Sequence, residues 1–131
     1  MGLCQECDKP YTGRLSGLWW CQQCNAKRFQ RDFSNWTSGN KFIDIFIRET
    51  QLNAKSNDGV LEWIPYNRFT NVQYLAKEGF STVYKATWLD GKIVRWDNIT
   101  NKWIREDGYD RNEVAIKNLD NSSNINGEFF K

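Results

Sequence analysis

Hydrophobic and polar positions recur with two different periods along this chain. In NWTSGNKFIDIFIRETQLN, residues 35–53, apolar residues return every three to four positions, which is typical of an amphipathic helix. Thr37, Ser38 and Asn40 stand at its start and are suitable N-caps. We expect Ile43 and Ile47 to lie next to one face of this helix. That face consists of Phe42, Ile45, Phe46, Glu49, Leu52 and Asn53.

A wide apolar stripe of this kind has to be covered, either by another part of the chain or by a partner protein. We favour packing within the chain. The polar stretch KSNDG ends the helical pattern, with Gly59 as its stop. Pro65 then excludes helix and favours an extended backbone, so we place a boundary after residue 65.

From Phe69 onward the pattern changes to short runs with a period of two, which predicts strands. STVYKATW is the clearest run, and Asp90-Gly91 after it is a strong turn signal. KIVRWD, KWIRED and NEVAIKNLD predict further strands of an antiparallel sheet. We expect residues 90–112 to form an extended, exposed hairpin with no chemistry of its own. A Lys at the end of the buried-type run VAIK needs a partner, and an anionic ligand would provide one.

Composition limits the classes of function. The chain has 131 residues, a formal net charge of +2 and no histidine, so a histidine base, nucleophile activator or metal ligand is excluded. Its length allows one average domain or two small ones. No apolar run is long enough for a membrane span, and the first ten residues lack the apolar core of a secretion signal. We therefore expect a cytoplasmic protein without a membrane partner.

The cysteines form two C-x2-C pairs near the amino terminus: Cys4, Cys7, Cys21 and Cys24. Two residues between thiolates allow a tight turn that directs both sulfurs to one point, and two such turns complete a tetrahedron around zinc. Four protein ligands leave no open position, so we expect a structural Zn2+ ion and not a catalytic one.

Other interpretations of this segment remain open. Two disulfides would suit a small secreted domain, and two redox-active thiol pairs are a third interpretation. In NAKRFQR, residues 25–31, basic residues surround Phe29 beside Trp19 and Trp20, a mixture that can hold single-stranded nucleic acid. We favour aromatic cover for a metal centre too small to have its own core. We do not expect nucleic-acid binding, because Zn2+ with four thiolates would bring the net charge to roughly zero.

EGFSTVYKA followed by VAIK resembles the first three strands of a protein kinase amino-terminal lobe. There a glycine-rich loop covers the ATP phosphates and a Lys on the third strand binds them. The wider arrangement is similar to a lineage-expanded group of kinase-like proteins from mycorrhizal fungi. These carry a CxxC…WCxxC knuckle, a segment like FSNWTSGNKFID, and a segment like LEWIPYNRF directly before the kinase domain. The resemblance covers essentially the whole chain.

The resemblance implies an α+β fold in three parts. These are a Cys4 zinc ribbon or knuckle at 1–35, a helical linker and extended tether at 36–65, and the antiparallel sheet of an incomplete kinase amino-terminal lobe at 66–131. It also implies an ATP site in which Lys117 binds phosphate while Ala115 and Val83 contact the adenine. The full expected set is Leu75, Ala76, Gly79, Phe80, Val83, Ala115 and Lys117.

The loop departs from the family pattern. Its three glycine positions are occupied by Ala76, Glu78 and Ser81, and Gly79 stands beside the second. Glycine lets backbone N–H groups approach phosphate closely, whereas a carboxylate there repels it by about 1 to 4 kcal/mol at effective dielectric constants between 80 and 20. We therefore expect weakened ATP binding.

The family's H-R-D and D-F-G motifs do not occur in these residues, so we assign no catalytic residue and expect the chain alone to be inactive. The resemblance implies the amino-terminal part of an ATP-dependent kinase acting on Ser, Thr or Tyr of a protein substrate. ATP would bind weakly, or only in the full-length parent. The alternative is a zinc-stabilised protein-interaction module with a vestigial pseudokinase lobe. An incomplete lobe would expose an apolar face and favour self-association.

Overall fold

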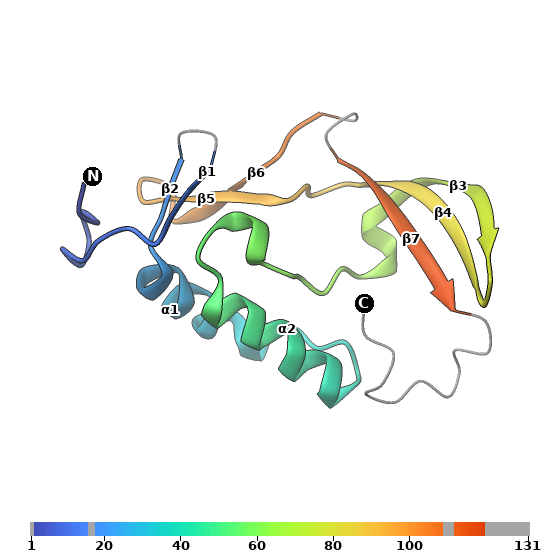
Figure 1. The fold of residues 1–131 in the computed structure, drawn as a ribbon, viewed down its shortest axis with the longest axis horizontal. Coiled ribbons are helices and arrows are strands. Elements are labelled where there is room, and N and C mark those ends of the chain that lie inside the picture. The colour runs from blue at the N-terminus through green and yellow to red at the C-terminus, as the bar shows by residue number, and fades with distance from the viewer. Residues whose placement is uncertain (1, 16–17, 109–111, 120–131) are drawn as a thin grey trace. The chain divides into compact units, whose positions relative to one another are not determined.

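The computed structural model describes residues 2–15, 18–108 and 112–119. They belong to two compact units, which we treat separately: residues 1–63 with 93–104, and residues 64–92 with 105–131. The fold is α+β with antiparallel sheets (Figure 1). The chain therefore leaves the first unit at residue 63, returns to it for one hairpin, and leaves it again.

The first unit contains both α-helices. Its elements are β1 (Gly13–Leu15), β2 (Leu18–Trp20), α1 (Gln22–Asp32), a 3-10 helix (Phe33–Asn35), α2 (Lys41–Asn53), a second 3-10 helix (Asn57–Gly59), β5 (Ile93–Asp97) and β6 (Lys102–Arg105). β1 and β2 form an antiparallel ribbon in which Gly13 pairs with Trp20. A side chain at Gly13 would collide with the Lys55 carbonyl oxygen, since a Cβ built there lies 2.1 Å from it. Glycine therefore lets the ribbon approach the segment that follows α2.

The core of the first unit is aromatic. Trp20, Phe29 and Ile93 are buried together, with Trp103 packed against them. The Trp103 ring stacks on Phe29 at a centroid distance of 4.6 Å and on Trp20 at 5.9 Å. The hairpin of β5 and β6 thus supplies part of this core. The sequence correctly predicts a hairpin here. The prediction that this hairpin is exposed is wrong, because Ile93 is only 2% exposed.

Helix α2 begins at the expected cap. The Asn40 side chain accepts hydrogen bonds from the backbone N–H groups of Phe42 and Ile43, at 2.9 and 3.2 Å. This satisfies two donors that a helix start leaves unpaired. The helix packs against α1, so the expected intramolecular packing is confirmed. Within the described ranges, neither helix combines the length and apolar character needed to cross a membrane.

The buried face of α2 is not the one expected. Asp44, Ile47 and Gln51 are buried, whereas the predicted stripe residues Phe42, Ile45 and Phe46 are 40–51% exposed. The polar residues are buried because each has partners. The Asp44 carboxylate accepts from the backbone and hydroxyl of Ser38 and from the Thr37 hydroxyl, and the Gln51 amide donates to the Leu61 carbonyl at 2.9 Å. These hydrogen bonds compensate the cost of removing the Asp44 carboxylate from water. They compensate that of Gln51 only in part, because its buried side-chain oxygen has no hydrogen-bond partner among the described residues.

The second unit is a three-stranded antiparallel sheet in the order β3, β4, β7. Its elements are a 3-10 helix (Tyr66–Arg68), β3 (Phe69–Glu78), β4 (Ser81–Trp88) and β7 (Glu113–Leu119). The expected antiparallel pairing is confirmed, but β5 and β6 form a separate sheet in the first unit. The run VAIK is not a buried strand, because Ala115 and Lys117 are exposed. In the described residues β7 lies at one end of the sheet.

Hydrogen bonds join the two positions at which the chain leaves the second unit for the hairpin and returns to it. The backbone N–H of Glu106 donates to the Lys92 carbonyl at 2.8 Å, and Arg105 donates to the Gly91 carbonyl at 2.9 Å. Gly91 has a positive φ of 75°, and a Cβ there would lie 2.2 Å from the Glu106 carbonyl oxygen. The predicted Asp90-Gly91 turn therefore brings the two chain segments together at a position where only glycine fits.

Candidate metal centre and candidate nucleotide site

The structure brings the four cysteines together. All four sulfurs lie within 4.8 Å of one another, with Cys4 Sγ 3.8 Å from Cys24 Sγ and Cys7 Sγ 3.7 Å from Cys21 Sγ. A disulfide needs about 2.05 Å, so these contacts are not disulfides. A tetrahedron with zinc–sulfur bonds of about 2.3 Å has sulfur–sulfur edges of about 3.8 Å. The cluster therefore has the dimensions of a tetrathiolate metal centre.

Each cysteine pair belongs to a turn that the local sequence favours. Cys4 and Cys7 lie in a tight knuckle in which the Asp8 N–H donates to the Cys4 carbonyl at 2.9 Å, and Asp8 has a positive φ of 63°. Cys21 is the N-cap of α1 and Cys24 lies in its first turn. A helix amino terminus carries partial positive charge, which stabilises thiolates.

The thiols respond differently to this environment. Burial raises the pKa of the Cys4 thiol, but hydrogen bonds from the backbone of Glu6 and Cys7 outweigh it and leave that pKa below its usual value. Burial raises the pKa of the Cys21 thiol, and burial together with the neighbouring sulfurs raises the pKa of the Cys24 thiol. Burial and the neighbouring sulfurs therefore oppose ionisation of the Cys24 thiol, and burial opposes that of Cys21. A divalent cation would remove this obstacle by compensating the thiolate charges.

Two rings that could have stacked on nucleic-acid bases are part of the core. Trp20 is 3% and Phe29 is 4% exposed, and the Trp20 indole N–H donates to the Ala54 carbonyl at 3.0 Å. Both rings are buried in the core with Ile93, so neither is exposed for stacking on a base; that they cover a metal centre stays a prediction.

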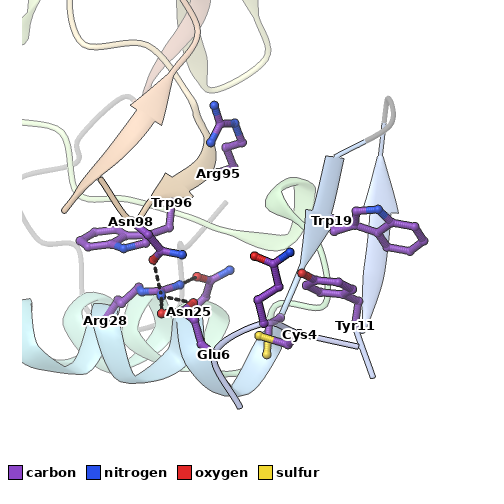
Figure 2. Close-up of a pocket in the computed structure, with 11 residues that line it drawn as sticks. Cys4, Glu6, Tyr11, Trp19, Asn25, Arg28, Arg95, Trp96 and Asn98 are labelled. Atoms are coloured by element: carbon purple, nitrogen blue, oxygen red, sulfur yellow. Dashed lines mark hydrogen bonds and ion pairs between the residues drawn. The ribbon is translucent and has the colours of Figure 1, made fainter. Parts of the chain in front are cut away.

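Arg28 forms a clamp that the sequence did not reveal (Figure 2). Its guanidinium donates to the Asn25 side-chain oxygen at 2.7 Å and to the Asn98 side-chain oxygen at 3.3 Å, and it pairs with the Glu6 carboxylate. It also lies 4.9 Å from the ring centroid of Trp96. Only 9% of the Arg28 side chain is exposed. Arg28 therefore connects the first knuckle, helix α1 and strand β5.

Sequence reasoning identified Arg28 only as one of several basic residues. Its partners come from segments 70 residues apart, and no local pattern relates Arg28 to Asn98. The only available signal was the pair of tryptophans in the predicted hairpin, Trp96 and Trp103, which indicates that one face of the hairpin is covered.

The expected nucleotide residues lie around one end of the three-stranded sheet. Ala76 pairs with Val83, and Val83 pairs with Lys117, so these three residues form one row across β3, β4 and β7. Directly opposed residues in an antiparallel sheet project to the same face. Ala115 pairs with Lys85 in a neighbouring row and shares that face.

Two of the remaining expected residues form the β3–β4 turn, and the third lies on β3 just before the row. Gly79 and Phe80 form that turn; Gly79 has a positive φ of 50° and Phe80 is 87% exposed. Leu75 lies where the β3 ladder skips one residue between Tyr74 and Ala76. It is half exposed and does not join the row.

Lys117 has a carboxylate next to it. Its amine lies 3.4 Å from a carboxylate oxygen of Glu78, and more than half of each side chain is exposed. Glu78, at a position where the resemblance leads us to expect glycine, thus faces the lysine expected to bind phosphate. Neither side chain is buried, so solvent screens the pair and its energy is small.

Comparison of the chain with protein-family models, with curated proteins and with solved structures finds no match.

Proposed function

We propose that this chain is a metal-stabilised amino-terminal region of a protein kinase-like protein, with a structural Zn2+ ion in the first unit and a nucleotide-binding sheet in the second. The observation that carries the second part is the row of Ala76, Val83 and Lys117 beside a turn that contains Gly79. Ala76 and Ala115 offer small apolar side chains to adenine, whereas Val83 on the same face is only 6% exposed. The Lys117 amine in the same row provides a counter-ion for phosphate.

For the metal, Cys4, Cys7, Cys21 and Cys24 would hold Zn2+ and leave no position open to substrate. The ion would stabilise the first unit and take no part in a reaction. The family's catalytic motifs are not found among these residues, so the proposed activity of this chain is nucleotide binding and not phosphoryl transfer.

The first test measures nucleotide affinity with the zinc-loaded chain. We expect Lys117→Met to reduce the affinity for MgATP at least tenfold in isothermal titration, because phosphate loses its direct counter-ion. Lys77→Met is the matched control, since Lys77 pairs with Thr82 and lies on the opposite face of the same sheet. Equal affinities for the two variants would exclude this nucleotide site.

The second test concerns Glu78. We expect Glu78→Gln to raise the affinity for MgATP about fivefold, because it removes a screened charge that competes with phosphate for Lys117. Glu78→Gly should raise it at least as much, since it also restores backbone access. Unchanged affinity in both variants would mean that the β3–β4 turn does not lie over the phosphates.

A second candidate function is a zinc-stabilised protein-interaction module. The exposed apolar residues of α2, Phe42, Ile45 and Phe46, favour it, because a contiguous apolar surface often marks a contact with another protein. In this case the chain would retain its metal and bind no nucleotide.

A further inference from the structure

A small pocket in the first unit lies beside the sulfur cluster (Figure 2). Its volume is about 110 Å3, and residues of the first knuckle, the β1–β2 ribbon, helix α1 and strand β5 line it. Sites for whole metabolites and drug-sized ligands have about 300 to 1,000 Å3. The pocket is therefore the right size for one side chain of a larger partner.

The Arg28 clamp determines which hydrogen-bonding groups the pocket presents. A side-chain amide has one acceptor oxygen and one donor NH2 group. Arg28 occupies the amide oxygens of both Asn25 and Asn98, so the two NH2 groups face away from it (Figure 2). Both carboxylate oxygens of Glu6 also accept from Arg28, and each keeps a second lone pair. The donors left for a ligand at these positions are the NH2 groups of Asn25 and Asn98.

Arg95 adds a positive charge to this donor set. It lies on β5 among the residues that line the pocket, and its side chain is exposed. The charge of Arg28 is compensated by Glu6. The Arg95 guanidinium points away from Arg28 and Asn98 in Figure 2, so this exposed side chain has to turn toward the pocket to pair with a ligand through two parallel N–H groups. A planar group with two acceptor oxygens fits this arrangement.

We propose that the pocket binds the carboxylate of an Asp or Glu side chain in an acidic peptide segment of a partner protein. A tetrathiolate Zn2+ centre formed with Cys4 and Cys21, which line the pocket, would carry net negative charge. This charge opposes any anion, a doubly charged phosphate more than a singly charged carboxylate, so the carboxylate depends on Arg95 as its counter-ion. With that centre the chain's net charge is roughly zero, so the sustained positive surface that nucleic acids require is missing. The proposal does not depend on nucleotide binding by the second unit.

The test uses the zinc-loaded chain and two short capped peptides, acetyl-Gly-Asp-Gly-amide and acetyl-Gly-Asn-Gly-amide. The side-chain NH2 resonances of Asn25 and Asn98 are followed by 15N NMR during titration. We expect saturable shifts of both resonances with the Asp peptide, and at least fivefold weaker binding of the Asn peptide, which has the same shape without the charge.

Two variants and one control separate binding from folding. Arg95→Gln should lower the affinity for the Asp peptide at least fivefold. Lys102→Gln, on the other strand of the hairpin and outside the pocket, should leave this affinity unchanged. Asn98→Asp keeps an acceptor for Arg28 but replaces the donor NH2, and should abolish binding while the zinc content stays at one ion per chain.

Three outcomes would overturn the proposal. These are equal shifts with the Asp and Asn peptides, equal affinities of the Arg95→Gln and Lys102→Gln variants, and tighter, Arg95-dependent binding of inorganic phosphate or an oligonucleotide. Because zinc content and MgATP affinity are measured separately, failure here is distinguishable from failure of the metal or nucleotide proposals.

Discussion

The two units of this chain are stabilised in different ways. The first gathers Trp20, Phe29 and Ile93 from three separate segments into one core beside the cysteine cluster. The second is a three-stranded sheet whose strand β3 is exposed along most of its length, and Tyr74 and Leu75 on it are more than half exposed. On the central strand β4, by contrast, Val83 is 6% and Ala86 is 2% exposed. The comparison shows that the first unit builds its core from distant segments, whereas the second buries mainly the middle strand of its sheet.

The largest expected effect concerns the metal. Structural zinc in small domains contributes about 10 to 16 kcal/mol of apparent binding free energy at neutral pH, so its removal should unfold the first unit. We expect one zinc per chain, and loss of near-ultraviolet circular dichroism from the tryptophans when a strong chelator is added. Cys24→Ser should have the same effect.

The control for this experiment is the second unit, which contains no cysteine. Hydrogen exchange of β4 amides in the presence of chelator shows whether the sheet survives loss of the metal. A zinc-free chain with an unchanged near-ultraviolet spectrum would contradict the metal-stabilised core.

The second-largest expected effect concerns the hairpin of β5 and β6. It belongs to the first unit but connects strands β4 and β7 of the second. Trp103→Ala should destabilise the first unit by about 3 kcal/mol, because it removes the ring stacked on Phe29 and Trp20. Ile99→Ala is the matched control on the same hairpin, since Ile99 is 92% exposed and should change little. Urea unfolding followed by tryptophan fluorescence measures both; equal midpoints would mean that the hairpin does not contribute to the core.

The smallest effect tests the buried polar face of α2. Burial raises the pKa of Asp44, but hydrogen bonds from Ser38 and Thr37 outweigh it and hold that pKa below its usual range. A carboxyl with a lowered folded-state pKa stabilises the fold above its unfolded-state pKa, about 3.9, and loses this contribution only as the pH falls through the folded value. Asp44→Asn should therefore cost about 1 to 3 kcal/mol at neutral pH.

This cost should stay constant between pH 8 and pH 6, because both pKa values of Asp44 lie below that window. By contrast, the affinity of the metal centre for Zn2+ should fall on acidification, since protons compete with the metal for thiolates. Glu49→Gln, at an exposed position of the same helix, is the control. A cost of Asp44→Asn that falls steadily from pH 8 to pH 6 would rule out the hydrogen-bonded carboxylate as its cause.

Local patterns were sufficient for several features. The two C-x2-C pairs predicted the cysteine cluster, because the spacing inside each pair already determines a tight turn or a helix start. Asn40 was identifiable as a cap, and Asp90-Gly91 as a turn, since both depend on the residue's own backbone preferences. The strands at residues 81–88 and 113–119 followed from short runs of strand-forming residues, and the structure pairs them with each other.

The features that can be predicted from the order of the residues are therefore short-range: the elements, their caps and the spacing of the metal ligands. The buried face of α2 cannot be predicted in this way, since Asp44 and Gln51 are buried by partners that hydropathy does not register. The same holds for the position of the hairpin in the unit of the cysteines and for the approach of Glu78 to Lys117. The reason is physical: hydrogen bonds, ion pairs and ring stacking join residues that meet only after the chain has folded, so no local period encodes them.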